Sequence, residues 1–129
     1  MVLDTYEKDT TLLVERILKP EMLFIDIGAH VGYYTLVAAR QVGSQGTVHA
    51  FEPEPCNYEL LVENIRLNDY TNITTHNLAV SSKSGPSNLF VSSLDSGRHS
   101  IYDHGLPKKD VVSVNSVAMD DFFESAGWP

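Results

Sequence analysis

The spacing of apolar residues in the first part of the chain follows two periods, one typical of helices and the other of buried strands. A near-continuous apolar run, as in "MLFIDI", indicates a strand buried on both faces of a parallel sheet. In chain order, the pattern predicts a helix at 9–18, a strand at 22–27, a helix at 31–42, a strand at 47–52, a helix from 55 to about 69 and a strand at 72–80. One core-facing stripe of the third helix is expected to consist of Tyr58, Leu61, Val62 and Ile65.

Strands that alternate with helices through short connections predict a parallel sheet with right-handed crossovers, and hence an α/β fold. After Val80 the pattern of apolar and polar residues changes. It predicts a turn-rich link, a short strand in "NLFVSS", a long polar stretch, a strand with alternating pattern at Val111–Val117 and the start of a helix in "MDDFFES". We interpret this part as hairpins at the edge of the sheet. The expected organisation is one partial domain over 1–129, with a helix in 1–20, cofactor-binding strand–helix units in 22–80 and a hairpin extension in 81–129.

Composition narrows the choice of partners. The 129 residues carry a formal net charge of -8, which disfavours nucleic acid or an anionic membrane surface as a partner. Cys56 is the single cysteine, and no apolar run approaches the about 20 residues that span a bilayer. These features predict a cytoplasmic domain.

Candidate chemistry lies where the first two strands end. Gly28 and Gly32 stand at a strand-to-helix transition, where glycine lets the main chain turn sharply and lets a ligand approach it closely. Ligands of open parallel sheets bind beyond the carboxyl ends of the strands, and Glu52 ends the neighbouring strand. Because a carboxylate there can accept both hydroxyl hydrogens of a ribose, the pair of features predicts an adenosine-containing ligand.

The glycine spacing bears on which adenosine ligand binds. A dinucleotide site of an NAD(P)-dependent oxidoreductase has the pattern G-x-G-x-x-G, whereas Ala29 and His30 fall at the positions where its middle glycine would be needed. Asp26 adds a negative charge that would repel a pyrophosphate but suit an ammonium group. S-adenosylmethionine has a ribose, an adenine and a cationic amino-acid tail without phosphate, so it is the cofactor that we expect.

The stretch "FIDIGAHVGYYTLVAARQVGSQGTVHAFEPEPCNYELLVENIRLN", together with "NLAVSSKSG" and "VVSVNSVAMDDFF", resembles the FkbM-type S-adenosylmethionine-dependent methyltransferases. The resemblance covers roughly 6–123. It implies a Rossmann-like class I methyltransferase fold and methyl transfer, typically to a hydroxyl oxygen of a small molecule or sugar. Carried over by position, the methionine part of the cofactor would contact Asp26, Gly28, Ala29, His30 and Gly32. Glu52 would bind the ribose, and Asn77 and Ala79 would lie near the adenine.

The chain departs from the family after its late strand. Family members continue with a fourth strand that resembles Lys-Ile-Asp-x-Glu-Gly, and no such stretch occurs before Pro129. We therefore expect a truncated fold with the first half of the sheet, and the sequence identifies no catalytic base. The first strand would then have an open edge, which a second copy of the chain or the late strand Val111–Val117 could cover. A non-catalytic remnant that serves as an interaction module is the alternative function.

Several simpler interpretations stand beside these. The glycines could serve only close packing, Glu52 could be a solvated strand end, and the His30 side chain could point outward. Tyr6 and Glu7 are candidates to cap the cofactor tail, and the loop "LDSGRHSIY" with Arg98 is a candidate to close over the site. Cys56 is expected to be an ordinary helix residue. No metal is expected, because His99, Asp103 and His104 lack the rigid spacing of a helical zinc motif.

Overall fold

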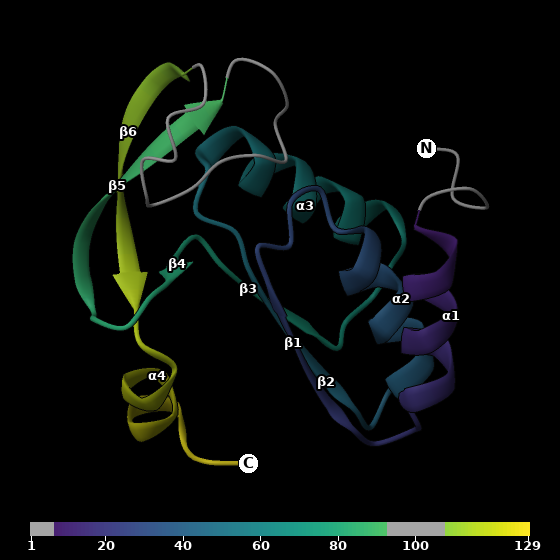
Figure 1. Cartoon of the computed structure of the whole chain (residues 1–129). Coiled ribbons are helices and arrows are strands. Elements are labelled where there is room, and N and C mark those ends of the chain that lie inside the picture. The colour runs from purple at the N-terminus through teal and green to yellow at the C-terminus, as the bar shows by residue number, and fades with distance from the viewer. Residues whose placement is uncertain (1–6, 93–107) are drawn as a thin grey trace.

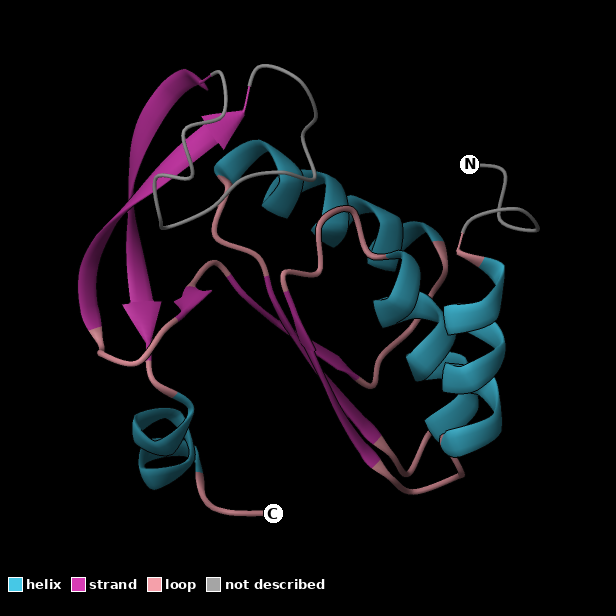
Figure 2. Cartoon of the chain, viewed as in Figure 1, coloured by secondary structure: helices cyan, strands magenta, loops and turns pink. Residues whose placement is uncertain are grey.

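The computed structural model describes residues 7–92 and 108–129, and its elements follow the expected order (Figures 1 and 2). They are α1 (Lys8–Ile17), β1 (Leu23–Ile27), α2 (Tyr33–Val42), β2 (Thr47–Phe51), α3 (Pro55–Leu67), β3 (Ile73–His76), β4 (Ala79–Val80), β5 (Gly85–Ser92), β6 (Lys108–Val117) and α4 (Met119–Ala126). The α/β class and the alternation of strands and helices are confirmed. Among the helices of the described ranges, none has the length and apolar content needed to cross a bilayer.

Strands β1, β2 and β3 form a parallel sheet in that order, with Asp26 opposite Ala50 and Ala50 opposite Thr75. Both α2 and α3 pack on the same face of this sheet. Val48 of β2 is fully buried against α2, and Ala50, two residues further along the same strand, is fully buried with Leu61 of α3. Side chains two apart on a strand point to the same face. This face therefore carries the main core, and Figure 1 shows α2 and α3 on one side of the strands.

The expected core stripe of α3 is correct for three of its four residues. Leu61 is fully buried, and Tyr58 and Ile65 pack against the same cluster, but Val62 is 40% exposed. The helix starts where the sequence predicts. Pro55 occupies its first turn, and the Glu54 side chain accepts a hydrogen bond from the main-chain N–H of Asn57 at 2.7 Å.

The predicted strand at 72–80 is wrong in one respect, because it divides at Asn77 into two strands that belong to different sheets. β4 lies parallel to β6, and β5 pairs with β6 as an antiparallel hairpin, so the second sheet has the order β4-β6-β5. Its small core consists of Ala79, Leu89 and Val114. The predicted hairpin after Val80 is thus present, and it belongs to a sheet of its own beside the parallel one (Figure 2).

The second face of the parallel sheet carries aromatic side chains, and α4 supplies one of them. Phe122 of α4 meets the rings of His49, Phe51 and His76 edge-on, with ring centroids 5.4, 5.2 and 5.1 Å apart. The two histidine rings stack, and His49 Nδ1 lies 3.0 Å from His76 Nε2. One helix thus packs on β2 and β3 from the side opposite to α2 and α3.

We expect this histidine pair to make the folded state sensitive to acid. Burial lowers the pKa of His49, and burial followed by the charge of His49 lowers the pKa of His76, both from the ordinary value of 6.5. The unfolded chain then binds more protons than the folded one, so the free energy of unfolding falls as the pH drops below about 6.5. Urea unfolding at pH 7.5 and 5.5 measures this fall. The double variant His49→Gln/His76→Gln should show a smaller fall, and equal falls in both proteins would contradict the prediction.

Strand β1 lies at the edge of the described sheet. Its one ladder in the described ranges is with β2, and Leu23 and Ile27 are 36% and 55% exposed. The expectation of burial on both faces was therefore wrong, because Leu23 and Ile27 share the face opposite to α2 and α3, where α4 packs on β2 and β3. The expected cover by Val111–Val117 was also wrong, since β6 pairs with β4 and β5.

Candidate cofactor site

The loop Gly28–Gly32 connects β1 to α2 at the carboxyl end of the strands. It includes three residues in the left-handed region, Gly28, His30 and Gly32, with φ of 73°, 56° and 102°. The carbonyl oxygen of Phe51 accepts hydrogen bonds from the N–H groups of Gly28 and Ala29, each at 2.9 Å. The end of β2 therefore holds the start of this loop.

The two glycines have different roles. A Cβ atom on Gly32 would lie 2.8 Å from Cδ1 of the buried Leu61, so this glycine allows the close approach of α3. Gly28 is exposed, and a Cβ there would have no described atom within 4 Å. The packing interpretation thus fits Gly32, whereas the space beside Gly28 admits a ligand next to the main chain.

Glu52 is 5% exposed, so the interpretation as a solvated strand end was wrong. Its main-chain N–H donates to His76 O at 3.0 Å, continuing the β2–β3 ladder. Its side chain links the loop Gly28–Gly32 to the segment that follows β2. Oε1 accepts a hydrogen bond from the N–H of His30 at 2.8 Å, and Oε2 accepts one from the N–H of Glu54 at 2.9 Å. Glu52 therefore holds the loop against that segment.

Asp26 lies behind the loop, under the first turn of α2. Its Oδ2 accepts a hydrogen bond from the buried Thr35 hydroxyl at 2.6 Å. Burial raises the pKa of Asp26, and hydrogen bonds from the side chain and main chain of Thr35 offset part of that rise. The N-terminus of a helix stabilises a nearby negative charge. The carboxylate thus joins β1 to α2 and places a negative charge close to the loop.

The two residues expected near the adenine are placed differently. Asn77 follows β3, and its Nδ2 donates to the carbonyl oxygens of Glu52 and Pro53 at 2.9 and 3.1 Å. It is exposed beside the end of β2. Ala79 is 5% exposed, and its side chain packs in the core of the second sheet. The structure thus brings Asn77 to Glu52 and gives the Ala79 side chain a packing role.

Two residues at this site were missed by the sequence interpretation. Thr35 fitted the apolar helix pattern, and nothing in that pattern distinguished its hydroxyl as a partner of Asp26. Asn64 of α3 donates from Nδ2 to Val31 O at 2.7 Å, across 33 positions of the chain. No local signal marks so distant a pair.

The start of α1 contacts the start of α2. The Tyr34 hydroxyl donates to Glu7 Oε2, and desolvation together with the Glu7 carboxylate raises the pKa of Tyr34 to about 12. This contact occupies Glu7, a residue expected to cap the cofactor tail. Two other residues expected near the cofactor or substrate, Tyr6 and Arg98, lie outside the described residues. The same holds for the residues considered for a metal, which are His99, Asp103 and His104.

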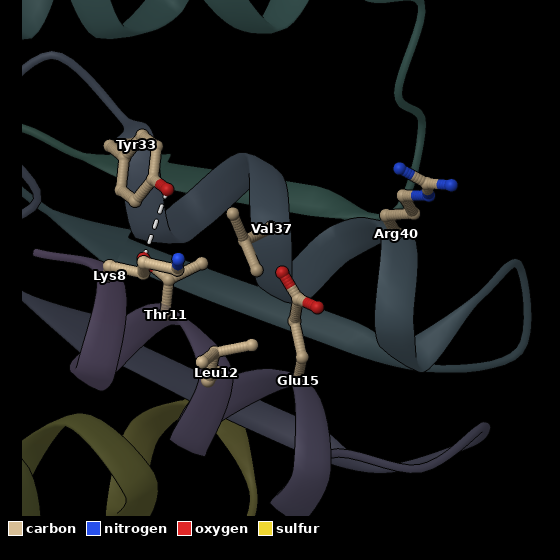
Figure 3. Close-up of a pocket in the computed structure, with 7 residues that line it drawn as sticks. All are labelled: Lys8, Thr11, Leu12, Glu15, Tyr33, Val37 and Arg40. Carbon is tan, nitrogen blue, oxygen red and sulfur yellow. Dashed lines mark hydrogen bonds between the residues drawn. The ribbon is translucent and has the colours of Figure 1, made fainter. Parts of the chain in front are cut away.

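A cavity of about 340 Å³ lies between α1 and α2 (Figure 3). Its lining residues are Lys8, Thr11, Leu12, Glu15, Tyr33, Val37 and Arg40. Thr11 Oγ1 and the Tyr33 hydroxyl form a 3.0 Å hydrogen bond across it. None of the predicted cofactor residues lines this cavity, so it is distinct from the site at the strand ends.

Comparison with family models gives one match, to the methyltransferase FkbM domain, over residues 26–127. The chain belongs to the FkbM methyltransferase family. This assignment confirms the resemblance, and with it S-adenosylmethionine as the cofactor. A search of curated proteins gave no match.

Solved structures agree with the family on the fold. An S-adenosylmethionine-dependent O-methyltransferase from Thermotoga maritima matches with a TM-score of 0.52 and 28% identity, over 57% of this chain and 28% of that one. A candidate rRNA methylase from Clostridium thermocellum matches with a TM-score of 0.52 and 18% identity, over 55% of this chain and 39% of that one. The Rossmann-like methyltransferase fold is confirmed. This chain covers well under half the length of either structure.

Proposed function

We propose that the loop Gly28–Gly32 and Glu52 bind S-adenosylmethionine, and that the chain takes part in methyl transfer to a hydroxyl oxygen of a small molecule or sugar. The observation that carries the proposal is the space beside Gly28. A left-handed, exposed glycine with no described atom where its Cβ would stand fits a main chain that a ligand approaches closely. This fit supports the cofactor that the family implies.

The residues of the chain suit the parts of that cofactor. The bound cofactor supplies an activated methyl group on a sulfonium. We assign the ribose hydroxyls to the Glu52 carboxylate, because it stands at the end of β2 and touches the loop through the N–H of His30. Asp26 and Glu52 together place negative charge near the loop, which favours a cationic amino-acid tail over a pyrophosphate. These charges also disfavour the nicotinamide-dependent alternative.

Oxygen as the methyl acceptor rests on the family resemblance and on the O-methyltransferase among the similar structures. The chain's own task in that step is to orient the acceptor and remove its hydroxyl proton. Among the described residues we assign no base to that proton.

The partners and the location remain proposals drawn from composition. The net charge of -8 supports an uncharged or cationic acceptor in preference to nucleic acid or an anionic membrane, and the single cysteine supports a cytoplasmic location. The exposed β1 edge supports a homodimer formed through a second copy of the chain. Light scattering after size exclusion tests the dimer, and a monomer at micromolar concentration would contradict it.

Calorimetric titration separates the candidate functions. We expect S-adenosylhomocysteine to bind with a 1:1 ratio and NAD not to bind. Binding of NAD alone would replace the proposal with the oxidoreductase. If neither ligand bound to a sample shown to be folded by circular dichroism, the non-catalytic interaction module would be the favoured function.

A further inference from the structure

The loop between β1 and α2 has a costly main-chain conformation. Gly28 and Gly32 adopt positive φ without penalty, but His30 has φ of 56° and carries a side chain. Such a conformation persists where the surrounding structure holds it. The contacts that hold this loop are therefore part of how the site is built.

Most of these contacts come from the end of β2 or from the loop itself. Phe51 O accepts hydrogen bonds from the first two N–H groups of the loop, and the Glu52 carboxylate accepts one from the third. Ala29 O accepts a hydrogen bond from the N–H of Gly32 at 2.9 Å. The carbonyl of Val31 follows His30, the residue with the costly conformation, in the chain. It accepts its hydrogen bond from Asn64 Nδ2 at 2.7 Å, and Asn64 is half-buried on α3.

The same helix contacts the loop at a neighbouring point. Leu61, one turn before Asn64, is the side chain that a Cβ on Gly32 would meet. Residues three apart on a helix share a face. α3 therefore contacts the end of the loop twice, once by packing at Gly32 and once by a hydrogen bond at Val31. The packing sets the distance, and the hydrogen bond sets the orientation of the peptide group that follows Val31.

We infer that Asn64 is a positioning residue for the amino-acid tail of the cofactor. It acts through the Val31 carbonyl, which belongs to the same peptide group as the N–H of Gly32, and fixing that group limits the rotation of the preceding residue His30. The inference rests on the proposed function, in which this loop holds the methionine part. The adenosine part is assigned to Glu52, at the end of β2.

The chain offers a matched control on the same helix. Asn68, four residues further on, is exposed, and its Nδ2 donates to Asn64 O at 2.7 Å. Asn68→Ala therefore removes a side-chain amide and a hydrogen bond of equal length, and it leaves the donor to Val31 in place. Asn64→Ala removes the donor to Val31, and Asn64→Leu removes the same donor while keeping the number and branching of the side-chain heavy atoms.

The test compares two ligands by calorimetry. S-adenosylhomocysteine has the amino-acid tail, and 5′-methylthioadenosine has the same nucleoside and sulfur without it. We expect Asn64→Ala and Asn64→Leu to bind S-adenosylhomocysteine about tenfold more weakly, with affinity for 5′-methylthioadenosine unchanged. Asn68→Ala should bind both ligands as the wild type does. A general loss of structure would weaken both ligands equally, and that result would overturn the inference.

Hydrogen exchange of the ligand-free proteins gives an independent readout. The N–H groups of His30 and Gly32 should exchange faster in Asn64→Leu than in the wild type or Asn68→Ala, while those of β2 should not change. Wild-type binding of S-adenosylhomocysteine by Asn64→Leu would overturn the role of Asn64 and leave the proposed function in place. If the wild type bound neither ligand, the proposed function would fail. Exchange of the His30 and Gly32 N–H groups at the wild-type rate in Asn64→Leu would show separately that Asn64 does not hold the loop.

Discussion

Replacing Glu52 with alanine is expected to weaken the binding of S-adenosylhomocysteine by about a hundredfold. Two hydrogen bonds from ribose hydroxyls to a charged carboxylate, at about 1.5 kcal/mol each, correspond to that factor. The free energy of unfolding should also fall, by about 2–4 kcal/mol, because the N–H groups of His30 and Glu54 lose their buried acceptor. Calorimetry and urea unfolding measure the two effects separately.

Two further variants make the Glu52 result interpretable. Glu59→Ala removes the same charge from an exposed position of α3 and should change neither quantity. Glu52→Gln keeps the side-chain size and one acceptor oxygen, so it should retain more stability than alanine while still losing affinity. If Glu52→Gln bound S-adenosylhomocysteine like the wild type, the carboxylate would not be a ribose ligand.

The elements on the helical side of the sheet could be predicted because local features determine them. The helix–strand periodicity located α1, α2 and α3 within about two residues, and Pro55 and Gly43 stand where helices begin and end. The candidate residues Gly28 and Glu52 were found in the same way. Each ends a strand, and the carboxyl ends of neighbouring parallel strands meet at one edge.

The features that could not be predicted depend on residues far apart in the chain. "NITTHNLAV" looks continuous, yet it divides at Asn77, whose amide donates to the carbonyls of Glu52 and Pro53. The apolar run of β1 predicts burial on both faces, but burial also depends on which elements pack over each face, and the pattern within one strand does not specify them. The contact of Phe122 with His49 and His76 likewise joins segments that no local pattern connects.

Replacing Gly28 with alanine is the sharpest test of where the ligand lies. With φ of 73°, an alanine there should cost about 1–2 kcal/mol in the free energy of unfolding, without a clash with any described atom. Its methyl group would occupy the space that we assign to the cofactor. Affinity for S-adenosylhomocysteine should therefore fall by roughly a hundredfold, or about 2.7 kcal/mol.

Gly43 is the matched control, because it also has positive φ and open space where a Cβ would stand. Its φ and ψ of 70° and -173° fall in a region that is nearly restricted to glycine, so Gly43→Ala should destabilise the fold at least as much as Gly28→Ala. It ends α2, at the opposite end of that helix from the loop, and should leave affinity unchanged. Loss of binding in Gly28→Ala alone therefore separates ligand contact from lost stability. Equal affinities in the two variants would mean that the cofactor does not approach the main chain at Gly28.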